Sequence, residues 1–291
     1  MIKIRKKISE KNIFPNFDLY NEYHKIDMLL SEKKTVGVVN KVGRVIHDYF
    51  TLEEYIEYVC FNNWNLRGTF ISIDDMRQGL GIEKSSFTPN DINEKHVLEF
   101  LQYAINCVNR VSTTIKSSKA SLLSDDTIIL LLWDNITLLV EKLNCTLELD
   151  KKNQEIFISY NNSTATTVST DYPDIKDSIS EYIRIDNRGD LKRKGEILCT
   201  LFKKLESVET KLKANNFGAI ASDATFLFNK SGIRHWVEQD KIACETFLQM
   251  NETELEVWYD KTFNLFLTCM VLAKYTDNMQ DIKNLKRTIG E

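Results

Sequence analysis

Apolar residues recur at helical spacing along much of this 291-residue chain. The two longest runs are Val97, Leu101, Ala104, Val108, Val111 and Ile115, and Leu191, Leu198, Leu201, Leu205, Val208 and Leu212. Spacings of three, four and seven residues place side chains on one face of a helix, so the runs predict single helices over residues 89–116 and 187–214. Their seams should be buried, in particular at Leu101, Val108, Leu201 and Leu205.

Capping signals predict further helices. Three pairs have the spacing of an N-terminal cap, and they are Thr51 with Glu54, Ser72 with Asp75, and Asn251 with Glu254. Leu19, Tyr23, Ile26 and Leu30 predict an earlier helix. Residues 125–143 read as a helix that is apolar on most sides, which other helices should surround.

Alternating or β-branched segments predict two hairpins. The segment "TVGVVNKVGRVI", residues 35–46, is β-branched and punctuated by glycine, and residues 145–160 alternate on both sides of a polar turn. The polar segment "NNSTATTVSTD", residues 161–171, reads as a loop before a short helix that starts at Pro173.

These patterns predict a mainly α fold, namely a helical bundle with small β-hairpins and a mixed α/β N-terminal region. We expect a small mixed α/β region over residues 1–88 and a helical bundle domain over residues 89–291, with a hairpin near 145–160. The scarcity of proline (3 residues) and glycine (10 residues) agrees with long helices and few turns.

Net charge and hydropathy limit the possible partners and the cellular compartment. With a net charge of −4, the chain has no global basic field, so an RNA partner would have to bind a local patch. The basic start lacks the apolar core of a signal peptide, and the longest apolar runs are too short to span a bilayer. We therefore expect a cytoplasmic protein without a membrane partner.

The 6 cysteines indicate free thiols. No two of them form a CxxC motif, so zinc knuckles and redox pairs have no sequence support. Most lie inside apolar helical patterns, where a cysteine behaves as a small buried apolar residue. We expect all of them to be reduced.

The sequence contains no complete motif for binding a cofactor or a metal ion. "GLGIEK" lacks the third glycine of a dinucleotide site, the chain has no P-loop or HExxH motif, and its 4 histidines are scattered. We therefore expect no cofactor and no metal site. Asp174, Asp190 and Lys192 superficially match a metal-dependent nuclease pattern, but that pattern needs a strand, and the last two residues open a helical run.

The segment "LFNKSGIRHWVEQD", residues 227–240, gathers Asn229, Lys230, Arg234 and His235 around Gly232. With the helices on either side, residues 187–275 resemble the HEPN superfamily of bacterial toxins and abortive-infection defence proteins. The resemblance implies a helical bundle, commonly dimeric, and metal-independent cleavage of RNA through an Arg-x(4–6)-His motif. This chain departs from the motif, because Lys230 and Asn229 stand where the arginine is expected.

The chemistry of this turn gives one functional hypothesis. His235 could act as general acid and base, since its pKa lies near neutrality, while Lys230 and Arg234 bind phosphate and Asn229 orients it. The alternative is a structural turn in a non-catalytic protein that self-associates or docks a protein partner. The sequence is compatible with both the catalytic and the structural interpretation of this turn.

Overall fold

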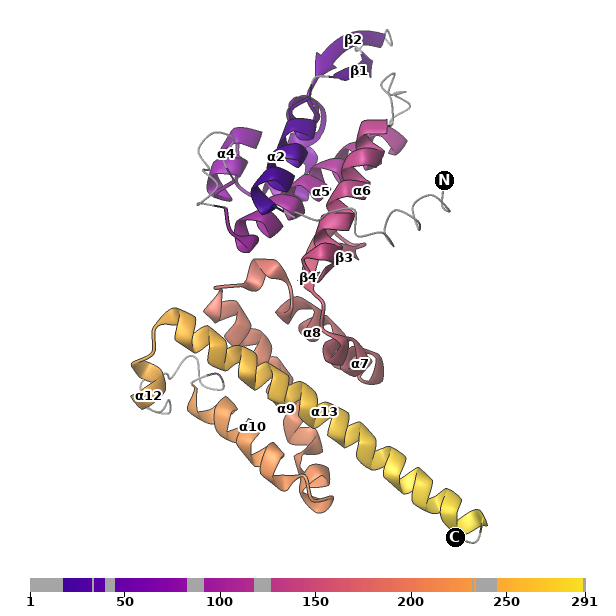
Figure 1. Ribbon diagram of the computed structural model, residues 1–291, viewed down its shortest axis with the longest axis vertical. Coiled ribbons are helices and arrows are strands. Elements are labelled where there is room, and N and C mark those ends of the chain that lie inside the picture. Colours follow the sequence, from indigo (N-terminus) through magenta and orange to yellow (C-terminus); the bar gives the residue numbers. More distant parts are fainter. Residues whose placement is uncertain are drawn as a thin grey trace. The chain divides into compact units, whose positions relative to one another are not determined.

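A computed structural model describes residues 18–32, 34–39, 45–82, 92–117, 127–231, 233 and 245–289 (Figure 1). The chain forms two compact units, unit 1 up to Ile158 and unit 2 from Ser159 onward. The prediction of a mainly helical fold with small β-hairpins is confirmed. The boundary expected near residue 88 differs from this division, because the long helix that follows it packs on the helices before it, within unit 1.

Unit 1 contains helices, short helical turns and two antiparallel hairpins. Its elements are α2 (Leu19–Leu30), β1 (Lys34–Val39), β2 (Val45–Phe50), α3 (Leu52–Tyr55), η1 (Ile56–Cys60), η2 (Phe61–Asn63), η3 (Asn65–Arg67), α4 (Ile73–Gly79), α5 (Glu94–Ser117), α6 (Thr127–Lys142), β3 (Cys145–Asp150) and β4 (Glu155–Tyr160), whose end passes into unit 2. β1 pairs with β2 from Lys34 opposite Phe50 to Val39 opposite Val45.

Local sequence signals explain several of these boundaries. Thr51 and Glu54 form the expected capping box at the start of α3, and the Ser72 side chain caps α4 by accepting from the Asp75 N–H at 3.0 Å. The long seam of α5 is buried, with Leu101 and Val108 fully covered. α5 begins at Glu94 rather than near residue 89, and the Asn93 side chain accepts from the His96 N–H at 3.1 Å.

The β3–β4 hairpin is attached to α5 through amide side chains. Asn106 donates to the Ile156 carbonyl at 2.7 Å and accepts from the Ile156 N–H at 2.8 Å. Gln102, one turn earlier, accepts from the Ile158 N–H at 2.8 Å. These bonds satisfy one edge of β4, which would otherwise present unpaired backbone groups.

The helix α6 is less enclosed than its composition suggested. Leu132, Ile136 and Val140 are buried, but Leu130 is 61% exposed and Leu138 is 43% exposed. The expectation that helices surround α6 is therefore wrong for this outer face. Among the described residues of unit 1, α6 packs against α2, α5 and β3 on its other side.

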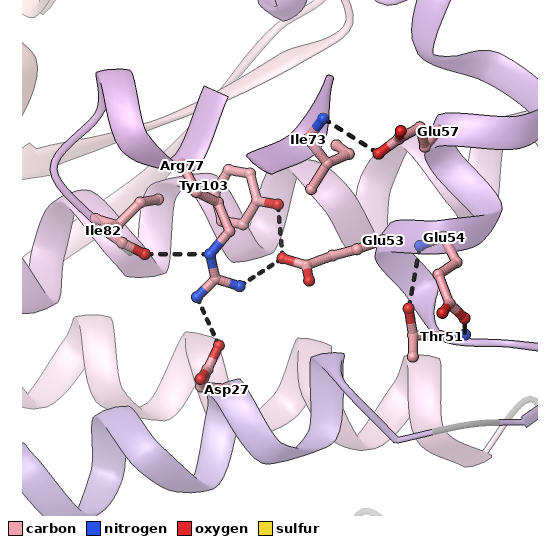
Figure 2. Close-up of polar contacts among 9 residues, drawn as sticks. All are labelled: Asp27, Thr51, Glu53, Glu54, Glu57, Ile73, Arg77, Ile82 and Tyr103. Atoms are coloured by element: carbon pink, nitrogen blue, oxygen red, sulfur yellow. Dashed lines mark hydrogen bonds and ion pairs between the residues drawn. The ribbon is translucent and has the colours of Figure 1, made fainter. Parts of the chain in front are cut away.

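One buried arginine connects four helices of unit 1 (Figure 2). Arg77 of α4 forms ion pairs with Glu53 of α3 at 2.6 Å and with Asp27 of α2 at 2.7 Å, and its Nε donates to the Ile82 carbonyl at 3.1 Å. The hydroxyl of Tyr103 on α5 donates to the same Glu53 oxygen at 2.7 Å. Burial opposes the charged guanidinium, but the two carboxylates outweigh burial and raise the pKa of Arg77.

Unit 2 is a helical assembly. Its elements are α7 (Ser163–Asp171), η4 (Pro173–Ile175), α8 (Lys176–Tyr182), η5 (Ile185–Asn187), α9 (Leu191–Ala214), α10 (Gly218–Lys230), α12 (Glu245–Leu248) and α13 (Glu252–Ile289). Figure 1 shows α9 and α10 beside α13, which is 38 residues long. Leu201 and Leu205 of α9 are fully buried in the shared core, as the sequence predicted.

The segment 161–171 was wrongly expected to be a loop, because most of it is the helix α7. Asn162 caps this helix by accepting from the Ala165 N–H at 2.9 Å. Ala165 and Val168, three residues apart, are both 1% exposed in the core of unit 2. Burial of two small apolar residues thus outweighs the weak helix propensity of serine and threonine.

We predict that Arg77→Met strongly destabilises unit 1, because Glu53 and Asp27 would lose their buried cation. The expected loss is about 3–5 kcal/mol of unfolding free energy, measured by urea denaturation. Lys25→Ala is the control, since the Lys25–Glu22 pair is a surface contact with a 63% exposed lysine side chain. The control should change stability by less than about 1 kcal/mol. Equal urea midpoints for the two variants would contradict this role of Arg77.

Candidate functional site

The residues predicted from the sequence lie at the end of α10. Lys230 is the last residue of this helix and is exposed, and Asn229 beside it is half-buried. Arg234 and His235 lie outside the described residues. The structure therefore places two of the four predicted residues in sequence at the C-terminal end of α10.

The chain leaves α10 through an anchored turn. Ser231 caps the helix, with its N–H donating to the Leu227 carbonyl at 3.0 Å and its hydroxyl donating to the same oxygen at 2.6 Å. Ile233 is fully buried in the core of unit 2. A lysine at a helix C-terminus also interacts favourably with the helix dipole, so Lys230 has a structural role available without catalysis.

The alternative nuclease residues have structural partners instead. Asp190 caps α9 by accepting from the Arg193 N–H at 2.8 Å, and Lys192 lies in the first turn of that helix rather than on a strand. Asp174 accepts from Lys204 at 2.8 Å, and this bond lowers the pKa of the Asp174 carboxyl. Among the described residues, no group of three or more histidine, cysteine or acidic side chains could hold a metal ion.

A buried lysine joins three helices of unit 2. The Nζ of Lys194, on α9, lies 2.8 Å from Glu256 and 2.8 Å from Asp260, both on α13. The hydroxyl of Tyr182, on α8, donates to the same Asp260 oxygen at 2.9 Å, and its ring stacks on Phe263 at a centroid distance of 4.0 Å. The lysine is 5% exposed, so this network lies at the end of the core of unit 2 where α9 and α13 begin.

The protonation states of this network follow from its partners. Burial works against ionisation of Glu256, but the Lys194 ammonium and the Gly189 N–H, 2.7 Å away, outweigh burial and lower the pKa of this carboxyl. Burial and the neighbouring Asp260 charge raise the pKa of Tyr182, which stays a hydrogen-bond donor. Because the Lys194 ammonium is buried and lies between two carboxylates, a substrate has little access to it, so we interpret the network as structural.

A different feature is presented to solvent on α13. The last buried residue of this helix is Thr276, and Asp277 pairs with Lys211 of α9. The helix continues through residues 277–289, about 20 Å at 1.5 Å per residue, beyond the ends of α9 and α10 (Figure 1). Nearly every residue of this extension is exposed.

An apolar stripe, defined here as Tyr275, Ile282, Leu285 and Ile289, begins just before the extension and continues along it. These side chains are 47%, 50%, 61% and 62% exposed, in that order. At 100° per residue, Tyr275, Ile282 and Ile289 lie about 140–180° from Phe266 around the axis of α13, whereas Leu285 lies about 100° from it, at the same angle as the buried Leu267. Tyr275 contacts the Phe217 ring edge-on at a centroid distance of 6.3 Å, whereas Ile282, Leu285 and Ile289 form an exposed apolar surface on an ordered helix.

The sequence did contain a signal for this stripe. Tyr275, Ile282 and Ile289 are seven residues apart, and Leu285 falls between the last two at a spacing of three, which is the heptad pattern of coiled coils. Phe263, Phe266 and Met270 on the same helix form a second apolar pattern, which belongs to the core. Two apolar patterns on one helix obscure each other when the helix is read as a single amphipathic element.

Comparisons with known proteins add no family to this picture, because no protein-family model, curated protein or solved structure matches the chain. Within the described ranges, no helix is long and apolar enough to cross a membrane. Of the expected reduced cysteines, the five in the described ranges are free thiols, and Cys244 lies outside them.

We predict that the Glu256 contacts stabilise unit 2 near neutral pH and not in acid. A lowered folded-state pKa adds stability above the unfolded-state pKa and loses it as pH falls through the folded value. Glu256→Gln should therefore lower the unfolding free energy by about 1 kcal/mol at pH 7, and the difference from wild type should shrink as pH falls through the lowered folded-state pKa of Glu256. Urea titrations at neutral and at acidic pH measure this. Exposed Glu252 on the same helix provides the control Glu252→Gln; a deficit independent of pH would contradict the prediction.

Proposed function

We propose that this chain is a helical interaction protein that docks a helix of a protein partner through the α13 stripe. The observation that supports the proposal is the exposed heptad pattern on the part of α13 that extends beyond the core of unit 2. Contiguous exposed apolar side chains on an ordered element are typical of interaction sites. Isolated exposed apolar residues, by contrast, need no explanation.

The docking surface has favourable energetics because its helix is already formed. An isolated helix as short as residues 277–289 would be marginal in water, so a free peptide would lose ordering entropy on binding. Here the helix propagates from a segment that the core of unit 2 fixes at Phe266 and Met270. Burial of three aliphatic side chains would then contribute about 1.5–3 kcal/mol each before association entropy is subtracted.

A photo-crosslinking experiment in cells that express the full chain tests this function. A benzophenone amino acid at Met279, beside the stripe, should form a covalent adduct with a protein, whereas the same group at Asn284, on the opposite side of the helix, should not. Ile282→Asp should abolish the Met279 adduct, because a charge would enter the apolar contact. No adduct at Met279, or adducts of equal yield at both positions, would contradict the proposal.

A ribonuclease is the second candidate function, and the exposed position of Lys230 at the end of α10 favours it. A cation there is accessible to a phosphate group, as the resemblance to HEPN proteins requires. His235 would act as general acid and base, with Lys230 and Arg234 binding phosphate and Asn229 orienting it. The mechanism would use no metal or other cofactor.

The ribonuclease proposal predicts RNA cleavage that persists in a metal chelator. His235→Ala should abolish this cleavage, because no other side chain of the turn titrates near neutrality. Lys230→Ala should weaken cleavage at moderate salt and reduce the salt dependence of RNA binding, since it removes one phosphate contact. Lys192→Ala, on the first turn of α9, is a matched control that should leave cleavage unchanged. Intact RNA under all conditions, or cleavage that survives His235→Ala, would reject the proposal.

A further inference from the structure

We propose that the partner of the α13 stripe is the same stripe of a second copy of this chain, and that the two helices form a short, parallel, two-stranded coiled coil. This inference rests on the proposed interaction function and names its partner. It is based on which residues occupy the core positions of the heptad and on the charges that flank them.

The core positions have the composition of a parallel dimer. If Tyr275 is an a position, then Ile282 and Ile289 are also a positions, while Asn278 and Leu285 are d positions. β-Branched residues at a combined with leucine at d favour two parallel strands. In such a dimer each residue packs against its own copy, so Ile282 meets Ile282 and Leu285 meets Leu285.

The flanking charges are complementary between two copies. Asp281 occupies a g position on one side of the stripe, and Lys286 occupies the following e position on the other side. In a parallel coiled coil a g residue faces the e residue five positions later on the other helix. Two equivalent pairs, Asp281 with the second copy's Lys286, would therefore form, and within the described part of the chain neither residue has an ion-pair partner.

Asn278 is the one polar residue in this core and would set the register. A polar side chain at a single core position specifies alignment and oligomer state at some cost in stability. In a parallel dimer the two Asn278 amides face each other and can exchange hydrogen bonds. Any shifted alignment would place this amide against Tyr275, Ile282 or Leu285, where it would be buried without a matching amide.

The first experiment measures the mass of the purified full-length chain by sedimentation over a range of concentrations. A monomer–dimer equilibrium is expected, and Ile282→Asp should weaken it about 100-fold or more, since each dimer would bury two adjacent like charges. Asn284→Asp adds the same charge on the opposite side of the helix and should leave the equilibrium unchanged. Because Ile282 lies outside the core of unit 2, the circular dichroism spectrum should be the same for all three proteins.

The second experiment tests the charge pairing. Asp281→Lys alone and Lys286→Asp alone should each weaken the dimer about tenfold, because two attractive pairs become repulsive. The double variant Asp281→Lys/Lys286→Asp should recover wild-type affinity. An equimolar mixture of the two single variants should form mixed dimers in preference to either homodimer.

The third experiment tests orientation. Under mild oxidation, Asn278→Cys should give a covalent dimer through residue 278, because equal d positions are adjacent only in a parallel, in-register pair. The oxidised wild-type chain is the control for its native cysteines, of which those in the described ranges are free and mostly buried.

Three results would overturn the proposal: a wild-type chain that stays monomeric, a dimer unaffected by Ile282→Asp, or a double charge variant that binds no better than the single variants. These results are distinguishable from failure of the interaction function itself. A monomeric chain whose Met279 adduct contains a different protein would reject the second copy as partner but keep the stripe as a docking site. A monomeric chain without any adduct would reject both.

Discussion

The packing of α9 against α13 is the constraint on which unit 2 and its candidate interaction surface depend. Leu201 and Leu205 on α9 and Phe266 and Met270 on α13 are buried in one core, to which α7, α8 and α10 add further apolar residues. This packing fixes the rotation of α13 about its own axis.

Each unit also contains a buried cation that connects several of its helices. Arg77 in unit 1 and Lys194 in unit 2 each lie between two carboxylates, with a tyrosine hydroxyl donating to one of them. Desolvation of the charges makes such networks weak sources of net stability, but removal of one partner leaves a buried charge uncompensated. Because Glu256 and Asp260 are one turn apart on α13, the Lys194 network holds both the position and the rotation of this helix relative to α9.

The two proposed functions rest on opposite kinds of surface in unit 2. The ribonuclease proposal depends on a polar turn after α10, from which the described residues give a lysine, an asparagine and the anchors Ser231 and Ile233. The interaction proposal depends on apolar side chains whose exposure and common orientation the structure gives directly. Exposed apolar area on an ordered helix is removed from water by association, whereas an exposed lysine is already well solvated. This difference makes the interaction function the better supported of the two.

The sequence by itself determined most of the local structure. Helical spacing predicted α5 and α9 with their buried leucines, and side-chain caps at Thr51, Ser72 and Asn251 marked where α3, α4 and α13 begin. These features depend on contacts within a few residues, so they can be read from one segment at a time. The same reading placed candidate chemistry at residues 229–235 but could not show whether the side chains converge.

Only the tertiary structure decided which apolar residues are covered and which charges are paired. Residues 161–171 read as a polar loop until burial of Ala165 and Val168 made them a helix. Arg77 pairs with Asp27, 50 residues away, and Lys194 pairs with Asp260, 66 residues away, so no local pattern could have predicted either network. On α13, the core residues and the stripe are equally apolar in sequence. They differ because α9 and α10 cover one side of this helix only as far as Thr276, which leaves the stripe exposed to solvent.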